Sequence, residues 1–324
     1  MTNLADVKNL TNDVSRALLP QGPVTATVQW QNPADIVITP VDGALGATVT
    51  GIDANQPQHP STILRLKKAL HEHFILIFKR QELDDSALLR FATYFGSVFV
   101  PPEDVPVLAS NTAGKAPDVV RVANVDGGYT GNGELTPHAD HQWTPIPSAG
   151  SLLYAVELPA VGGDTSWYNI HQAYLDLDEA TKAQLEGLQH ITYNPFLRHV
   201  LNAQRKAEGL EAEYPKYRSP ARPILGPGFP HPLVRTHPDS GKKVLFLSTH
   251  TESEILGIDQ AEAEALIARL RAHIQQDKYR YEHRWALGDI MYWDNQATLH
   301  SRTAFPETER RVLKRVSLAG SRPF

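Results

Sequence analysis

The sequence predicts a mainly β protein in which helices pack outside an antiparallel core. Short runs of apolar or alternating residues, bounded by Gly, Pro, Asn and Asp, recur along most of the chain. Only a few longer segments carry apolar residues at helical spacing. No run of about 18 apolar residues occurs, so no membrane-spanning helix is expected.

The first half of the chain is predicted to alternate short strands with two helices. A helix begins at Pro60-Ser61, because Pro suits the first helical turn and apolar residues follow at helical spacing through Leu70. The unbroken apolar run 74–78 has the length of a buried strand. We expect strands at 36–40, 47–51, 74–78, 119–122 and 151–158, and helices from 60 and at 84–95.

The second half is predicted to hold a strand edge at 165–168 and a mostly helical stretch at 170–188. Residues 193–229 contain five Pro and no stable period, and we interpret them as a lid or insert. The turn Pro238-Asp239-Ser240-Gly241 separates the apolar runs 233–236 and 244–247, which predicts a hairpin. A helix at 259–276 and strands at 279–285, 290–293 and 312–319 complete the chain.

Length and composition fit one elaborated domain. Of the 324 residues, 1–34 are predicted to be an N-terminal extension and 35–324 a single domain. The absence of cysteine excludes disulfides, zinc-thiolate sites, iron-sulfur clusters and Cys nucleophiles, and it fits the cytoplasmic location that we expect. The net charge of -5 offers no excess of cations to a nucleic acid. Residues 1–10 lack the apolar stretch of a secretory signal.

Two His-x-Asp sequences occur, and one such match is expected by chance in a chain with 14 His. His237-Pro238-Asp239 enters the predicted hairpin turn, where we expect Asp239 to cap its own backbone. His138-Ala139-Asp140 instead follows a Gly-rich loop and precedes a buried strand. In extended chain, residues two apart point to the same side, so His138 and Asp140 can reach one metal ion.

A second imidazole, His300, lies seven residues after Trp293. Two His and one carboxylate on one face of an iron ion leave positions open for a co-substrate and oxygen. Arg311 and Arg315 follow in a predicted strand and share one face by parity. Guanidinium groups on an inner face need anions, and a dicarboxylate co-substrate would supply one. Without His300 nearby, the default interpretation would be two solvated surface arginines.

These motifs together resemble the TauD/TfdA family of Fe(II)- and 2-oxoglutarate-dependent dioxygenases, from residue 35 to the C-terminus. Their order and spacing agree with the family pattern. The matching pieces are His138-Ala139-Asp140, Glu157-Leu158-Pro159 with Gly162-Gly163-Asp164-Thr165, Trp293-Asp294-Asn295 with His300, the pair Arg311 and Arg315, and the hairpin 232–242.

The resemblance implies a double-stranded β-helix (jelly-roll, cupin-like) core with flanking helices. By position, His138, Asp140 and His300 would be the catalytic Fe(II) ligands. Thr165 and Arg311 would hold the distal carboxylate of 2-oxoglutarate, and Arg315 would lie near the co-substrate or an anionic substrate. Asp140 also counts against a halogenase, because those enzymes lack the carboxylate ligand.

Departures from the taurine-specific branch bear on the substrate. That branch carries a His after the Phe-Gly that matches Phe95-Gly96, and a Trp and an Asn before the first iron ligand. This chain has no such His, and it has Pro137 and Glu134 at the other two places, so taurine is not the expected substrate. The candidate substrate contacts are Phe99, Asn124, Glu134, Arg198, His250 and Arg315.

The implied activity is oxidation, most simply hydroxylation, of a small organic, anionic substrate with O2 and 2-oxoglutarate, releasing succinate and CO2. Alternatives on the same iron centre are desaturation, cyclisation or epimerisation in a biosynthetic pathway. A non-catalytic metal-binding jelly-roll protein is a third alternative. No nucleic-acid or membrane partner is expected, and self-association is expected from the resemblance alone.

Overall fold

The computed structural model describes residues 30–100, 118–128, 130–193, 207, 209, 228–249 and 253–324. The chain divides into two units, Met1–Trp30 and Gln31–Phe324, and the elements below belong to the second unit. Within the described residues, no helix has the length and apolar character needed to cross a membrane.

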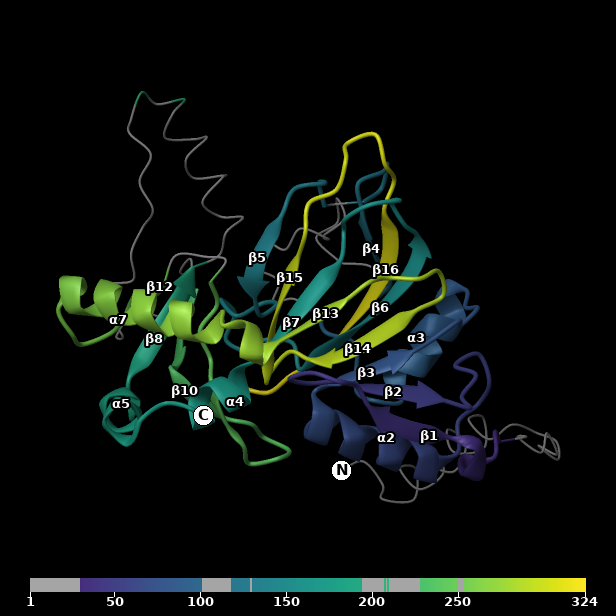
Figure 1. Cartoon of the computed structure of the whole chain (residues 1–324), viewed down its shortest axis with the longest axis horizontal. Helices are drawn as coiled ribbons and strands as arrows, with labels where there is room; N and C mark the ends of the chain where they lie inside the picture. The colour runs from purple at the N-terminus through teal and green to yellow at the C-terminus, as the bar shows by residue number, and fades with distance from the viewer. Residues whose placement is uncertain are drawn as a thin grey trace, which may run out of the picture. The chain divides into compact units, whose positions relative to one another are not determined.

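Seven strands of the described chain form the larger sheet (Figure 1). Their order is β1 (Val37–Pro40), β2 (Ala47–Thr50), β3 (Ile75–Phe78), β14 (Ile290–Asp294), β6 (Gly150–Glu157), β16 (Val312–Leu318) and β4 (Val120–Ala123). Neighbours pair antiparallel, except that β2 and β3 are parallel. The parallel pair is possible because helix α2 (Pro60–His73) connects the two strands as a crossover.

Four described strands form a second, fully antiparallel sheet in the order β13 (Arg280–His283), β7 (Thr165–Asn169), β15 (Thr298–Arg302) and β5 (Leu135–His138). The register places His300 directly opposite His138, and Arg302 opposite Thr165. The sequence pattern did not predict β5 and β15 as separate strands, because each is short and interrupted by polar residues that face the site.

Two smaller sheets complete the β structure of the described chain. β12 (Ser253–Ile255), β8 (Gln189–Tyr193) and β9 (Gly228–Pro232) form one, and the hairpin of β10 (Val234–Thr236) and β11 (Lys243–Leu245) forms the other. The hairpin was predicted. β8 and β9 were not, and they flank the predicted lid 193–229, most of which lies outside the described residues.

The helices begin where side chains cap them. Asp84 accepts the Ala87 amide at the start of α3 (Asp85–Thr93), and Asp259 does the same for Ala261 at α7 (Gln260–Ile274). The stretch 170–188 is mostly helical, as predicted, but it is divided into two helices. The chain forms α4 (Ile170–Leu175) and α5 (Glu179–Leu185), because Asp178 caps a new helix through the amide and hydroxyl of Thr181.

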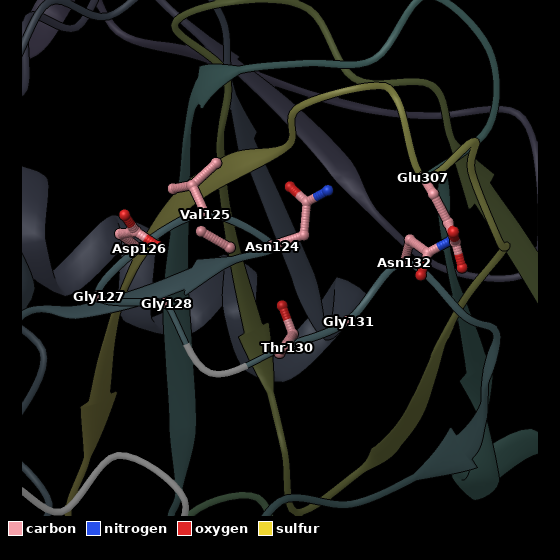
Figure 2. A pocket seen from close by; sticks show the side chains of 10 residues that line it. Asn124, Val125, Asp126, Gly127, Gly128, Thr130, Gly131, Asn132 and Glu307 are labelled. Atoms are coloured by element: carbon pink, nitrogen blue, oxygen red, sulfur yellow. The ribbon is translucent and has the colours of Figure 1, made fainter.

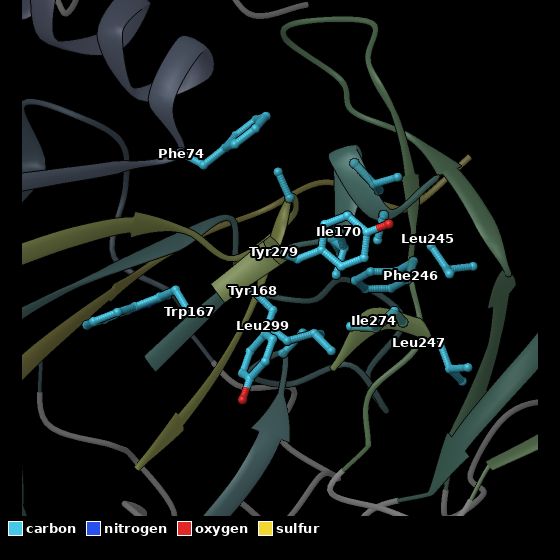
Figure 3. Close-up of a cluster of buried hydrophobic side chains, with 14 of the residues drawn as sticks. Phe74, Trp167, Tyr168, Ile170, Leu245, Phe246, Leu247, Ile274, Tyr279 and Leu299 are labelled. Carbon is cyan, nitrogen blue, oxygen red and sulfur yellow. The ribbon is translucent and has the colours of Figure 1, made fainter. Parts of the chain in front are cut away.

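Alternation along the seven-stranded sheet divides the core into two layers. Ile75, Leu153 and Trp293 belong to one buried cluster, and their strand neighbours Leu76, Leu152 and Tyr292 belong to the other. The second cluster includes apolar residues of α2 and α3, which pack on this sheet (Figure 1). The first cluster includes the buried residues of the four-stranded sheet and continues to α4, β11 and α7 (Figure 3).

Candidate metal centre

Three predicted metal ligands converge at one end of the four-stranded sheet. His138 is the last residue of β5 and His300 lies directly opposite it on β15, with ring centroids 4.2 Å apart. Asp140 follows β5, and its Oδ1 lies 3.9 Å from His138 Nε2 while its Oδ2 lies 3.9 Å from His300 Nε2. One ligand atom from each residue lies within 4.8 Å of the others. Among the described residues, this is the one cluster of metal-ligating side chains.

The protonation states of the triad suit a divalent cation. Burial lowers the pKa of His138 to about 4, so the imidazole is neutral near pH 7 and its lone pair is available. Burial alone would raise the pKa of Asp140. The Arg315 guanidinium donates to Asp140 Oδ2 at 3.0 Å. Its charge, together with the nearby histidines, outweighs the effect of burial and holds the pKa of Asp140 well below its usual range. The donor set is therefore two imidazoles, of which that of His138 is neutral near pH 7, and one carboxylate, a set that Fe(II) accepts.

Arg311 is buried with an unsatisfied donor. Only 2% of this residue is exposed, and its Nε donates to the Gly163 carbonyl at 3.0 Å. Within the described chain, Arg311 Nη1 has no hydrogen-bond partner. A Cβ on Gly163, whose φ is +71°, would lie 2.9 Å from the Arg311 side chain. Glycine at position 163 thus permits both the left-handed backbone and the close approach of the guanidinium.

Thr165 and Arg302 lie opposite one another on β7 and β15, in the sheet that carries the triad. The Trp285 indole donates to the Thr165 hydroxyl at 3.0 Å. Arg302 is 5% exposed and donates to the carbonyls of Gly131 and Gly133. Burial, and then the nearby Arg302 charge, lower the pKa of Arg311 to about 9.

Arg302 was missed in the sequence analysis, although parity could have found it. Arg302 lies two residues after His300, so both side chains belong to the same face of β15. Trp285 carried no comparable signal, because its neighbour Thr165 is distant in sequence.

The predicted substrate contacts are distributed unevenly. Phe99 stacks on His141, next to Asp140, with ring centroids 4.1 Å apart and planes 16° from parallel. Asn124 accepts the Arg311 amide at 2.9 Å and donates to the Glu309 carbonyl at 2.8 Å, so its side chain fixes the start of β16. Glu134 is exposed. His250 and Arg198 lie outside the described residues.

A pocket of about 530 Å³ lies beside the β4–β5 loop (Figure 2). Asn124, Asp126, Thr130, Asn132 and Glu307 contribute its polar side chains. None of the triad, Thr165 or Arg311 is among its lining residues. Its carboxylates also make it a poor site for an organic anion. This pocket therefore does not contain the residues predicted to bind the metal and the co-substrate.

The second His-x-Asp sequence is structural, but the expected cap is wrong. His237 Nδ1, and not the Asp239 carboxylate, accepts the amides of Asp239 and Ser240 at 3.3 and 3.1 Å. His237 Nε2 lies 2.8 Å from Asp294 Oδ2 in the core. The buried His237 ring lies within hydrogen-bonding distance of both turn amides. The Asp239 side chain is 60% exposed and lies near His71 instead.

Comparisons with known proteins agree with this geometry. The sequence profile described as taurine catabolism dioxygenase TauD, TfdA family matches residues 38–317. The chain is 32% identical to an (S)-phenoxypropionate/alpha-ketoglutarate-dioxygenase of Sphingobium herbicidovorans over 87% of this chain and 94% of the relative. It is 31% identical to an alpha-ketoglutarate-dependent 2,4-dichlorophenoxyacetate dioxygenase of a Burkholderia species, over 81% and 87%. The solved structure of AAD-2 in complex with Mn(II) and N-oxalylglycine has a TM-score of 0.69 and 27% identity, over 89% and 98%.

The chain therefore belongs to the TauD/TfdA family, which confirms the resemblance seen in the sequence. It is an enzyme, a 2-oxoglutarate-dependent dioxygenase that acts on a small molecule. The mainly β fold with a few helices matches that of solved relatives.

Proposed function

We propose that His138, Asp140 and His300 hold Fe(II), and that Thr165 and Arg311 bind the distal carboxylate of 2-oxoglutarate. The observation that carries this proposal is the triad of two imidazoles and one ionised carboxylate, with ligand atoms within 4.8 Å of one another. When bound, the iron supplies the redox chemistry that couples reduction of O2 to decarboxylation of 2-oxoglutarate.

The co-substrate assignment rests on the buried charge of Arg311. An unsatisfied guanidinium donor in a buried place costs free energy, and a carboxylate would satisfy it with a charge-assisted bond. Arg302 adds a second cation in the same region, which strengthens the preference for an anion. Gly163 leaves the space that the guanidinium needs, and the Thr165 hydroxyl can donate to the same anion while accepting from Trp285.

Arg315 has a different task in this proposal. Its bond to Asp140 Oδ2 lowers the pKa of the carboxyl group and engages one of its two oxygens. The other oxygen stays free to ligate. Arg315 also leaves a positive charge beside the triad, because one carboxylate does not neutralise both a guanidinium and a divalent cation. The resulting field favours an anionic substrate.

The substrate that fits these groups is a small organic acid with an aromatic part. The stacked rings of Phe99 and His141 offer an apolar wall next to Asp140, and Arg315 offers the charge. Two relatives are named for phenoxypropionate and 2,4-dichlorophenoxyacetate, which combine those properties. We expect oxidation to proceed as hydroxylation, with a gain of one oxygen atom.

A paired screen tests this proposal. The enzyme, with Fe(II), ascorbate and 2-oxoglutarate, is offered aryloxy carboxylic acids and the matching neutral amides, and succinate release and product mass are measured. We expect the acids to stimulate succinate release and the amides to do so far less. Equal turnover of acids and amides would contradict the role of charge, and absence of succinate with every member would contradict the substrate class.

Finer features of the fold extend the proposal. We infer that the seven-stranded and four-stranded sheets make a double-stranded β-helix, supported by the shared buried cluster between them. Residues 35–324 would act as a single domain, with 1–34 as an extension and 193–229 as a lid or insert. A cytoplasmic location and a homo-oligomeric state stay predictions.

A further inference from the structure

The backbone around Asp140 is held by side chains beyond the end of strand β5. The Asn295 carboxamide bonds both backbone polar groups of Asp140. Asn295 Oδ1 accepts the Asp140 amide at 2.8 Å, and Asn295 Nδ2 donates to the Asp140 carbonyl at 3.0 Å. Ser248 Oγ accepts the amide of Ala139 at 3.0 Å. Because two bonds to one residue resist its rotation about the chain, Asn295 fixes the direction in which the Asp140 side chain leaves the backbone.

Asn295 is itself anchored in the core. It is 1% exposed, and its Nδ2 also lies 2.9 Å from the Ser148 carbonyl and 3.2 Å from the Ser148 hydroxyl. Its backbone amide donates to the Ala149 carbonyl at 2.9 Å. Every polar atom of this carboxamide therefore has a partner, and a fully bonded buried network holds a single geometry.

The residue after Asp140 explains why such an anchor is needed. His141 has a φ of +60°, a left-handed backbone that residues with a Cβ rarely adopt. Its Nδ1 lies 3.1 Å from Ser148 Oγ, and its ring stacks on Phe99. Ser148 Oγ therefore contacts both Asn295, which bonds the Asp140 backbone, and His141, the residue that follows Asp140.

We propose that Asn295, assisted by Ser148, is a positioning residue for the metal site: it sets the Asp140 carboxylate toward His138 and His300. This inference rests on the proposed role of the triad as metal ligands. Without Asn295, the amide and carbonyl of Asp140 are buried without partners and the segment shifts to satisfy them. Loss of a partner that orients a metal ligand lowers metal affinity by about 10–100-fold.

The test measures metal binding without turnover. Mn(II) is titrated calorimetrically into the wild type, Asn295→Ala, Asn295→Asp and the control Thr298→Val. We expect Asn295→Ala to weaken Mn(II) binding by about 10–100-fold. Asn295→Asp places a carboxylate oxygen against the carbonyls of Asp140 and Ser148, and we expect this variant to weaken Mn(II) binding at least as much. Thr298 donates to the Asp294 carbonyl in the same turn, and this bond does not involve Asp140. The Mn(II) affinity of Thr298→Val should therefore stay within about twofold of the wild type.

A second readout separates positioning from general damage. Saturating Fe(II) restores most of kcat in Asn295→Ala, because the ligands remain, but not in Asp140→Ala. Unchanged Mn(II) affinity in a folded Asn295→Ala overturns the inference. If that variant fails to fold, Ser148→Ala decides: a loss of about fivefold supports the inference and an unchanged affinity overturns it. A wild type that binds no Mn(II) defeats the proposed function instead.

Discussion

Two pairs of histidines face each other across antiparallel strands, and only one pair has a carboxylate beside both rings. His138 and His300 lie opposite on β5 and β15, and His190 and His231 lie opposite on β8 and β9. The first pair has Asp140 within 3.9 Å of both rings. The second is enclosed by Phe246, with no carboxylate in a metal-binding cluster among the described residues.

The difference shows that paired imidazoles do not make a metal centre by themselves. His190 is fully buried, and burial lowers its pKa to about 3 and that of His231 to about 4. These rings are neutral near pH 7 and could offer lone pairs, as the His138 ring could. What they lack is an anion to offset the charge of a cation, whose transfer into an apolar core is otherwise prohibitive.

The largest effect is expected when the carboxylate beside His138 and His300 is removed. Asp140→Ala removes the carboxylate ligand, and we expect metal affinity to fall by roughly a thousandfold and succinate release to disappear. Calorimetric Mn(II) titration and a succinate assay measure both. The matched control is His190→Leu in the second pair, which should leave Mn(II) affinity within about twofold. Full activity of Asp140→Ala would show that the metal assignment is wrong.

The next effect concerns two arginines, Arg271 and Arg311. Arg271, near His190, is satisfied by the Ser248 carbonyl and the Ser253 hydroxyl, whereas Arg311 keeps an unpartnered donor. Arg311→Gln should therefore raise the 2-oxoglutarate requirement several hundred-fold, as expected for loss of a buried charge-assisted pair of about 3–5 kcal/mol. The apparent KM for 2-oxoglutarate measures it.

The neighbouring Arg310 is the control for that variant. Its side chain is 62% exposed and bonds to Glu157 on the surface. Arg310→Gln should leave the apparent KM for 2-oxoglutarate within about twofold. Equal effects of the two substitutions would remove Arg311 from the proposed pocket.

A third prediction concerns the lowered pKa values of His190 and His231. The pKa values of His190 and His231 lie below the usual 6.5, so the unfolded chain binds more protons than the folded chain between pH 6.5 and about 4. The free energy of unfolding must then fall as pH falls through this window. Each histidine contributes a slope of about 1.4 kcal/mol per pH unit.

Urea unfolding of His190→Leu at several pH values checks this slope. Leu cannot bind a proton, so the variant should lose stability less steeply than the wild type by about 1.4 kcal/mol per pH unit. Parallel curves for the two proteins would mean that His190 is protonated in the folded state or exposed to solvent.

The smallest expected effect concerns the second His-x-Asp sequence. Asp239→Ala should change the free energy of unfolding by less than about 0.5 kcal/mol, because the carboxylate is exposed and His237 makes the turn bonds. Metal binding should not change. A loss of Mn(II) affinity in Asp239→Ala would contradict the distinction between the two His-x-Asp sequences.

Most of the large sheet, the hairpin and the capped helices were predictable because their signals are local. Apolar residues marked β6 and β16, and Asp84 and Asp259 marked helix starts. Five strands were missed, namely β5, β8, β9, β12 and β15; β12 has only three residues, and β9 contains two Pro. The break between α4 and α5 depends on one capping bond that the apolar spacing does not reveal.

The sequence by itself determined which residue types could carry the chemistry: the order His138, Asp140, His300, Arg311, and parity that puts i and i+2 on one side of a strand. Only the tertiary structure decided which histidines face a carboxylate, that Arg315 is the partner of Asp140, and that Asn295 holds this ligand's backbone. These contacts join residues more than 150 positions apart. Their geometry follows from strand register and buried hydrogen bonding, which no local pattern encodes.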